Sequence, residues 1–378
     1  MKKIKFIIVP VSLLLALNMI YCSKDSSIEP ETTIAEELQE VLDEKLEIFN
    51  GTGVSAAVVF PDGDTWSGTS GVSFGTTAIT PDMIFGIGSV TKVFIAALCL
   101  ELAEEGTFSL DDSLFQWLPD YPNIDNSITI LQLLNNTSGI YNITDNTEVW
   151  DAVFADPAKS WTPEEIISAF LPEPYENPGE GYYYSNTNYI LLGKIINEAT
   201  GSTVSTELRN RFFEPLGFND TFFEFEEILP SNIAHGWFDL GGNGSIDDVS
   251  LISGTGIYSV LWAAGAIFST AEDLAKWSSA LFRGEVLSQS SLNQMLTSYA
   301  TYPGTTDVGC GLGVFLIGPG NNAGVELVGY TGRTFGYLTS LFYVPDHGFS
   351  VAVMVNEDNV TCLDEITTAL IIEVLSTM

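Results

Sequence analysis

The chain has 378 residues, of which 46% are hydrophobic and 16% are charged. This composition is typical of a folded protein with a large core, and it excludes an intrinsically disordered chain. The formal net charge of −36 at pH 7 disfavours anionic partners, so we expect no nucleic-acid partner and no binding of the folded surface to anionic lipid.

The first 22 residues have the pattern of an export signal. Lysines precede an apolar run at 6–20, which is short for a membrane-spanning helix. Cys22 and the polar stretch after it are typical of a bacterial lipidation site. We predict a lipoprotein-type signal peptide at 1–22, a linker at 23–33, and an exported protein that associates with a membrane only through a lipid on Cys22, facing the periplasm or the cell surface. Ordinary signal cleavage is the alternative.

The other cysteines and the histidines do not form a recognisable site in the sequence. Cys99, Cys310 and Cys362 are odd in number and lack the spacing of metal ligands, so we expect no disulfide framework, no metal and no cofactor. His235 and His347 fall in a loop pattern and a turn pattern. A Ser-His-Asp triad is therefore disfavoured.

Helical and strand patterns follow one another from residue 34 to 378, which we interpret as one domain. The pattern predicts an α+β fold: an antiparallel sheet flanked by N- and C-terminal helices, with a helical lobe inserted at about 106–270. The expected elements are helices over Ile34–Phe49 (capped by Thr33), Leu131–Leu134, Pro163–Phe170, Tyr189–Glu198, Ala271–Phe282 and Glu365–Leu375, with hairpins of Gly53–Phe60 and Thr65–Val72 and of Tyr337–Val344 and Phe349–Asn356.

Ser89 and Lys92 stand where a glycine-containing stretch, 85–88, runs into an apolar segment, 93–102. A helix beginning at Ser89 would bring residues three apart onto one face, and its first amides would face an incoming negative charge. A hydroxyl beside an amine is a nucleophile beside its base. The spacing alone is a weak signal, because a chain of this composition provides about one such pair by chance.

Three segments, in order along the chain, resemble the motifs of one superfamily. Ser89-Val90-Thr91-Lys92 has the Ser-x-x-Lys pattern of the serine β-lactamases and penicillin-binding proteins. Tyr184-Ser185-Asn186 resembles the second motif of the class C branch, which includes esterases and D-amino-acid peptidases, and Tyr330-Thr331-Gly332 stands at the third. The resemblance covers about 34–378 and implies the same antiparallel sheet with a helical lobe.

The resemblance also implies a role for each motif residue. Ser89 would attack a substrate carbonyl while Lys92 takes its proton, which requires a neutral lysine, and apolar neighbours favour its burial. Tyr184 would relay a proton to the leaving group, and the Asn186 amide would hold Lys92 or a substrate carbonyl, although it could simply cap a turn. The backbone N–H groups of Ser89 and Arg333 would form the oxyanion hole.

Tyr330 departs from the usual third motif, in which lysine or histidine precedes the residues equivalent to Thr331 and Gly332. A cation there would bind a substrate carboxylate, so its loss favours an esterase or peptidase over a β-lactamase. Arg333 follows directly. It either replaces the missing charge or is a strand residue that reaches solvent or pairs with an acid, and the sequence leaves both interpretations open.

We therefore predict a serine hydrolase (EC 3) that forms an acyl-enzyme with an ester, a D-amino-acid peptide or a β-lactam-like compound. Its partner would be a small molecule or a peptidoglycan peptide. The alternative is a penicillin-recognising binding or sensor module, or a cell-wall-binding lipoprotein without turnover. The predicted site comprises catalytic Ser89, Lys92 and Tyr184, and substrate-binding Asn186, Tyr330, Thr331, Gly332 and Arg333.

Overall fold

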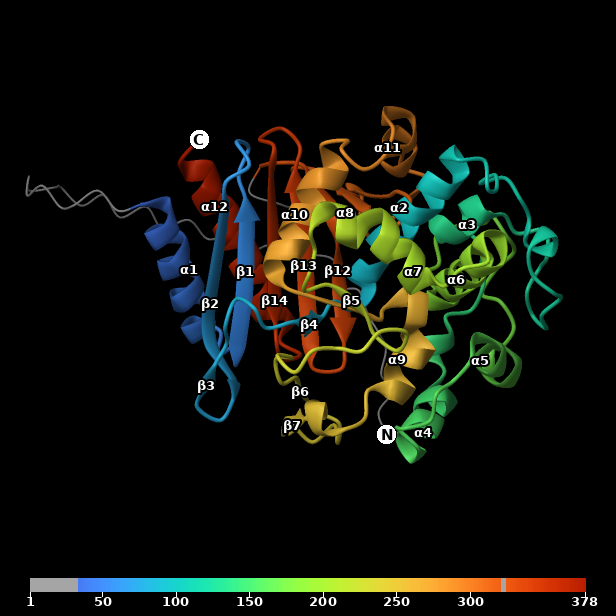
Figure 1. Ribbon diagram of the computed structural model, residues 1–378, viewed down its shortest axis with the longest axis horizontal. Helices are drawn as coiled ribbons and strands as arrows, with labels where there is room; N and C mark the ends of the chain where they lie inside the picture. The colour runs from blue at the N-terminus through green and yellow to red at the C-terminus, as the bar shows by residue number, and fades with distance from the viewer. Residues whose placement is uncertain (1–32, 321–323) are drawn as a thin grey trace, which may run out of the picture.

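The computed structural model describes residues 33–320 and 324–378, and its centre is a large antiparallel sheet (Figure 1). The predicted export signal, Cys22 and residues 23–32 of the linker lie outside the described residues. Within those residues the sheet has nine strands, in the order β3-β2-β1-β14-β13-β12-β11-β10-β9. Their bounds are Thr77–Ala78 (β3), Thr65–Phe74 (β2), Gly53–Val59 (β1), Phe349–Val355 (β14), Tyr337–Val344 (β13), Leu327–Thr334 (β12), Phe315–Ile317 (β11), Val308–Cys310 (β10) and Ala300–Thr301 (β9).

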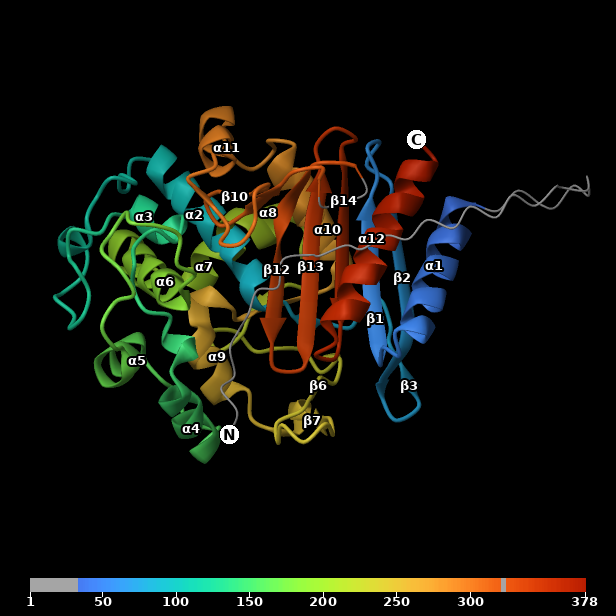
Figure 2. The same cartoon turned by 180° about the vertical axis from the view of Figure 1, so that it is seen from behind.

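The first and the last long strands of the described chain are neighbours in this sheet. β1 pairs with β14 in a register that places Val54 opposite Val355. Every residue of β1, β13 and β14 is buried, as expected for strands covered on both faces. Helices α1 (Ile34–Ile48) and α12 (Val360–Ser376) cover one face and α10 (Ala271–Phe282) covers the other (Figures 1 and 2). The predicted fold class is confirmed.

The remaining helices gather at one side of the sheet (Figure 1). Their bounds are Thr91–Glu104 (α2), Ile130–Leu134 (α3), Thr147–Ala155 (α4), Pro163–Phe170 (α5), Asn186–Thr200 (α6), Val204–Leu208 (α7), Glu214–Leu216 (α8), Thr255–Leu261 (α9) and Gln289–Met295 (α11). Short strands complete the described part: Phe85–Gly86 (β4), Phe222–Phe223 (β5) and Ile267–Ser269 (β8) form one small sheet, and Trp237–Phe238 (β6) pairs with Asp247–Asp248 (β7).

Local sequence signals account for the ends of the helices that flank the sheet. Thr33 caps α1 in a reciprocal capping box with Glu36, as the sequence predicted for this cap. The C-terminal helix begins at Val360, one turn before the predicted start at Glu365, because the Asn359 side chain accepts a hydrogen bond from the backbone N–H of Cys362. The additional turn brings the first residues of α12 beside β13.

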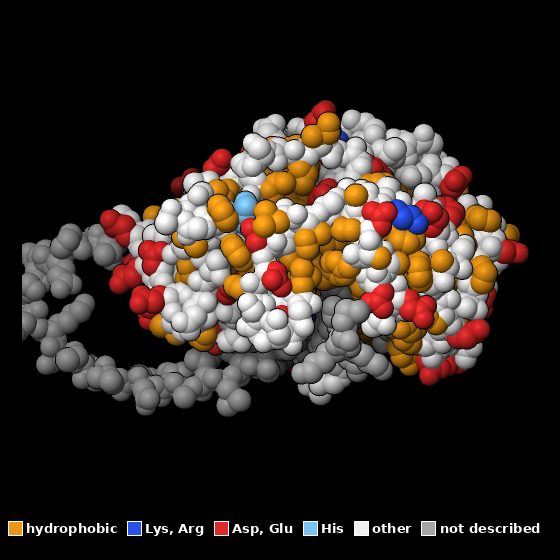
Figure 3. Space-filling view, turned by 90° about the horizontal axis from the view of Figure 1, so that it is seen from below, with side chains coloured by type: hydrophobic (Ala, Val, Ile, Leu, Met, Phe, Trp, Pro, Cys, Tyr) orange, Lys and Arg blue, Asp and Glu red, His pale blue; other side chains and the backbone are white. Residues whose placement is uncertain are grey.

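The surface is acidic and the cysteines are internal. Acidic side chains are spread over the face drawn in Figure 3, where Lys and Arg side chains are sparse. Cys99, Cys310 and Cys362 are buried and unpaired, and burial raises the pKa of each thiol. No helix in the described part of the chain is both long enough and apolar enough to cross a membrane.

Trp277 joins the sheet side of the molecule to the helical side. This residue of α10 is fully buried, and its ring stacks on Phe94 of α2 with ring centroids 4.3 Å apart. We expect Trp277→Ala to lower the free energy of unfolding by about 3–5 kcal/mol, because it leaves a large cavity in the core. Urea unfolding measures the change. Phe115→Ala is the control, since Phe115 is 66% exposed and its loss should change stability by less than about 0.5 kcal/mol. Similar losses for both variants would contradict this role of Trp277.

Candidate active site

Ser89 lies on a tight turn that packs against β12 of the sheet. Gly88–Val90 form a 3₁₀ turn that leads directly into α2. Gly88 has φ +51°, and a Cβ atom there would lie 2.7 Å from the backbone nitrogen and oxygen of Arg333. Only glycine fits this position, so β12 and the nucleophile turn pack backbone against backbone.

Lys92 is fully buried one helical turn after Ser89. Its Nζ atom lies 3.1 Å from Ser89 Oγ and donates a hydrogen bond to the backbone oxygen of Ala264 at 2.6 Å. Burial lowers the pKa of the Lys92 amine well below its ordinary value, because a charged ammonium loses its hydration there. No carboxylate among the described residues forms an ion pair with Lys92 to offset this effect. The predicted burial of Lys92 is present in the structure.

Tyr184 reaches the same serine from the helical lobe. Its phenol oxygen lies 2.6 Å from Ser89 Oγ, and its hydroxyl donates a hydrogen bond to Asn186 Oδ1 at 3.0 Å. Burial raises the pKa of Tyr184 and the hydrogen bond to Ser89 lowers it, with a net rise. At neutral pH Tyr184 is therefore a protonated phenol that can give a proton to another group.

Asn186 holds the phenol of Tyr184. Its oxygen accepts from Tyr184 and its Nδ2 donates to Thr144 Oγ1 at 2.8 Å, so of its two predicted partners Lys92 is not the one bound here, and a substrate carbonyl stays a prediction. The Lys92 amine is held by the Ala264 carbonyl instead. Asn186 therefore fixes the phenol of Tyr184 in place, and it also lines the pocket.

Asn136 organises the loop that carries Tyr184. It is buried, has φ +58°, and its side-chain oxygen accepts from the Ser185 backbone N–H at 3.1 Å and from Asn188 Nδ2 at 3.0 Å. Asparagine tolerates this left-handed conformation better than most residues. Asn136 therefore links the loop that carries Tyr184 to the first turn of α6.

The third motif lies on β12, and three of its four predicted site residues line the pocket. Thr331, Gly332 and Arg333 line the same pocket as Ser89. Tyr330 does not line this pocket; it is buried and stacks on Phe315 with ring centroids 4.4 Å apart. Its ring is thus packed in the core beside the pocket, and its predicted role in substrate binding stays a prediction.

The Arg333 side chain pairs with an acid. Its guanidinium donates to Asp358 Oδ2 at 2.5 Å, and both side chains are partly exposed. Of the two interpretations left open by the sequence, the structure shows the acid-paired strand residue. The positive charge nearest to Ser89 in the described pocket wall is therefore already neutralised.

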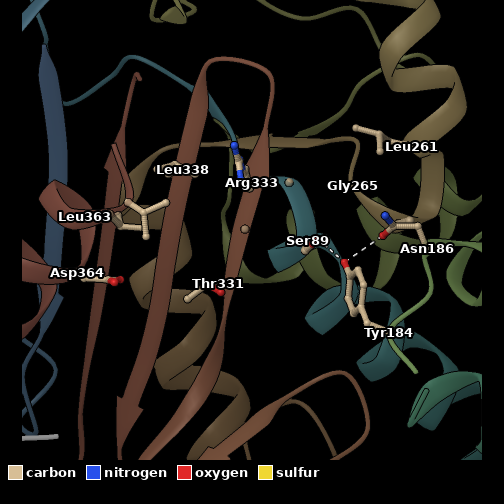
Figure 4. Close-up of a pocket in the computed structure, with 14 residues that line it drawn as sticks. Ser89, Tyr184, Asn186, Leu261, Gly265, Thr331, Arg333, Leu338, Leu363 and Asp364 are labelled. Carbon is tan, nitrogen blue, oxygen red and sulfur yellow. Dashed lines mark hydrogen bonds between the residues drawn. The ribbon is translucent and has the colours of Figure 1, made fainter. Parts of the chain in front are cut away.

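The pocket contains further residues that the sequence did not single out as functional. Figure 4 shows Ser89, Tyr184 and Asn186 on one side of β12, and Leu363 and Asp364 of α12 on the other. No spacing rule identifies these α12 residues, because β12 brings distant segments of the chain together. The Ala264 carbonyl was not predicted as the partner of Lys92 either, because the fold brings together two residues that are 172 positions apart in the sequence.

A serine hydroxyl between an amine and a phenol, at the edge of an antiparallel sheet, is the arrangement of a serine hydrolase, and comparison with known proteins agrees. The chain belongs to the β-lactamase family, whose model matches residues 42–375. This membership makes the protein a hydrolase.

Among curated proteins, the chain is similar to penicillin-binding protein 4* of Bacillus subtilis, with 26% identity over 287 residues, which are 74% of this chain and 62% of that protein. It is also 32% identical to penicillin-binding protein 4 of Amycolatopsis lactamdurans over 194 residues, 48% of this chain and 47% of the relative. The chain thus spans less than two thirds of the length of each of these two relatives.

Solved structures match over more of their length. A D-stereospecific amidohydrolase from Streptomyces sp. is 30% identical with a TM-score of 0.77, covering 88% of this chain and 98% of that one. The D-amino acid amidase of Ochrobactrum anthropi SV3, in complex with D-phenylalanine, is 28% identical with a TM-score of 0.79, covering 91% of this chain and 99% of that one.

Gly332 determines how closely β12 approaches the nucleophile turn. A Cβ atom on Gly332 would lie 1.9 Å from the Ile87 backbone oxygen and 3.1 Å from the Ser89 backbone nitrogen. We expect Gly332→Ala to push the strand away, lower stability by about 1–3 kcal/mol, and slow the reaction of Ser89 with a fluorophosphonate. Thermal unfolding and labelling rates measure both effects. Thr331→Ala is the control on the same strand, and equal behaviour of the two variants would contradict the prediction.

Proposed function

We propose that the protein is a serine amidohydrolase that forms an acyl-enzyme through Ser89 and acts on small amides of D-amino acids. One observation carries the proposal: the Ser89 hydroxyl lies within 3.1 Å of a buried lysine amine and 2.6 Å of a tyrosine hydroxyl. Attack by a serine alcohol requires a group that removes its proton as the new bond forms. The Lys92 amine, kept neutral by burial, is that group.

In the proposed acylation step, Ser89 Oγ forms a bond to the substrate carbonyl carbon while its proton moves to Lys92 Nζ. Collapse of the tetrahedral intermediate breaks the bond to the leaving nitrogen, which takes a proton from the Tyr184 hydroxyl. The proton held on Lys92 then restores the Tyr184 phenol. Water attacks the acyl-enzyme by the reverse proton path and releases the acid.

The oxyanion of the intermediate requires hydrogen-bond donors in a fixed position. The backbone N–H groups of Ser89 and Arg333 are the proposed donors. Supporting this choice, the Arg333 peptide packs directly on Gly88, and Ser89 and Arg333 line one pocket. β12 also pairs with β11 only at Leu327–Gly329, which leaves residues 330–334 without a strand partner on that side among the described residues.

The choice of D-amino-acid amides rests on the similar solved structures and on the charge of the pocket. Their titles describe a D-stereospecific amidohydrolase and a D-amino acid amidase, and each matches nearly its whole chain to this one. The charge of the described pocket wall is the second support: its cation, Arg333, is paired with Asp358, and the third motif has an uncharged tyrosine at 330. A substrate whose recognition requires a carboxylate partner, such as a β-lactam, is a poorer fit.

A substrate panel with Ser89→Ala as control tests the proposal. We expect steady release of ammonia from D-phenylalaninamide, much slower release from the L enantiomer, and little hydrolysis of nitrocefin. Ser89→Ala should abolish turnover, and Tyr184→Phe should lower kcat by about 10²–10⁴ through loss of the acid. A single stoichiometric burst without turnover would instead identify a penicillin-recognising sensor, and the absence of any Ser89 labelling by a fluorophosphonate would exclude both.

The proposed base makes a separate prediction about pH. Only the neutral amine of Lys92 can accept a proton, and its pKa is lowered by burial, so kcat/KM should rise with pH through a pKa well below that of a free lysine. Lys92→Arg should lose this rise, since a guanidinium stays protonated throughout the accessible range. Kinetics on a neutral ester between about pH 5 and 10 measure the profile. A flat profile for the native protein would count against Lys92 as base.

A further inference from the structure

The wall of the active-site pocket continues past β12 to the first turns of the C-terminal helix. Leu338 of β13 and Val360, Leu363 and Asp364 of α12 belong to the same lining as Ser89. In Figure 4 the Leu363 and Asp364 side chains lie on the side of β12 opposite to Tyr184. The pocket therefore has two ends, one at the helical lobe and one at α12.

The α12 end contains an acid without a counter-charge. No hydrogen bond or ion pair joins the Asp364 carboxyl to another residue in the described ranges 33–320 and 324–378. Burial, and to a smaller extent the neighbouring Glu365, raise the pKa of Asp364 to about 6. The group is still ionised at neutral pH. Its charge is only partly hydrated there, so a cation that came within reach would be attracted strongly.

The other charges around this end do not compensate Asp364. Arg333 is the cation in the pocket wall, and it is bound to Asp358. Burial lowers the pKa of the Lys92 amine, which disfavours its charged form, and Lys92 does not belong to the described pocket lining. Counting Arg333, Asp358 and Asp364, the local sum is one negative charge, which opposes a carboxylate and favours an ammonium group at this end.

The lobe end of the pocket has the opposite character. Leu261, Ala264 and Gly265 line it next to Ser89, and they present apolar side chains or bare backbone. An apolar acyl group fits there, which leaves the α12 end for the part of the substrate beyond the scissile bond. We propose that Asp364 selects the leaving group by charge: the enzyme accepts neutral and cationic leaving groups and rejects those that end in a carboxylate.

This inference rests on the proposed acyl-enzyme chemistry and adds a rule about its substrates. A free C-terminal carboxylate next to the cleaved bond would be repelled, so the protein would be an amidase rather than a carboxypeptidase. The residue acts by touching the leaving group and takes no part in the proton transfers.

Three D-phenylalanyl amides test the rule, with ethylenediamine, glycinamide and glycine as cationic, neutral and anionic leaving groups. For the native protein we expect kcat/KM to fall in that order. Asp364→Asn should lower the value for the cationic substrate about tenfold and raise it for the anionic one by a similar factor, while the neutral one changes less than about twofold. Asp364→Glu should keep the native order. Glu365→Gln is the matched control, because it removes the same charge one residue away, outside the pocket lining.

Binding of the same compounds to Ser89→Ala, measured by calorimetry, distinguishes failure of the proposed D-amide function from failure of the charge rule. If no substrate is hydrolysed but the binding order follows charge and is lost in Ser89→Ala/Asp364→Asn, the D-amide function fails and the charge rule stands. If all three are hydrolysed with equal kcat/KM, or if Glu365→Gln changes the order as much as Asp364→Asn does, the charge rule is overturned. The neutral substrate reports whether each variant is folded.

Discussion

The desolvation of one amine is the constraint on which the site depends. Lys92 lies on α2, which contacts α6 and α11 on one side and β12 on the other, so both halves of the molecule exclude water from it. A buried ammonium would lose several kcal/mol of hydration without a partner ion, and the neutral amine avoids that cost. The Ala264 carbonyl satisfies one N–H and adds no negative charge. In the proposed mechanism, exclusion of water from Lys92 activates the nucleophile and no neighbouring cation is required, which fits a third motif without lysine or histidine.

Close backbone packing is the second requirement of the site. Ser89 belongs to the start of a helix, whereas Arg333 belongs to a strand 244 residues later in the sequence. Their peptides approach because Gly88 and Gly332 leave no side chain between them. The two halves of the proposed oxyanion hole are therefore positioned by the docking of the lobe on the sheet. A movement of the lobe relative to the sheet would first separate the two proposed donors. The distance between Ser89 and Lys92 would change less, because both residues belong to one continuous helical segment.

Much of this arrangement was predictable from residue patterns, and the reasons differ from element to element. The helices at Pro163–Phe170 and Ala271–Phe282 have the predicted bounds, because capping and periodicity are local signals. The strand Tyr337–Val344 also matches, between clear turn residues. Two-residue strands such as β4 and β5 were not predicted, since they exist only through pairing with β8.

The site shows the same division between local and long-range information. Ser89, Lys92 and Tyr184 were found from their motifs, and the structure brings them together. The contacts of Asn186 with Tyr184 and Thr144 were not predicted, because motif order does not determine the orientation of an amide side chain. Asp358 and Asp364 were not identified, since each depends on a contact between α12 or the turn before it and a strand far away in the sequence.

The buried cysteines have a consequence for the chemistry of the whole molecule. Cys99, Cys310 and Cys362 all lie inside the fold, and burial keeps their thiols protonated at physiological pH. A thiol reacts with oxidants and alkylating agents as the thiolate, so these side chains are poor targets for such reagents. The described part of the protein therefore places its reactivity on an oxygen nucleophile and not on sulfur. We therefore expect the proposed Ser89 chemistry to be insensitive to mild oxidants and to thiol-alkylating reagents.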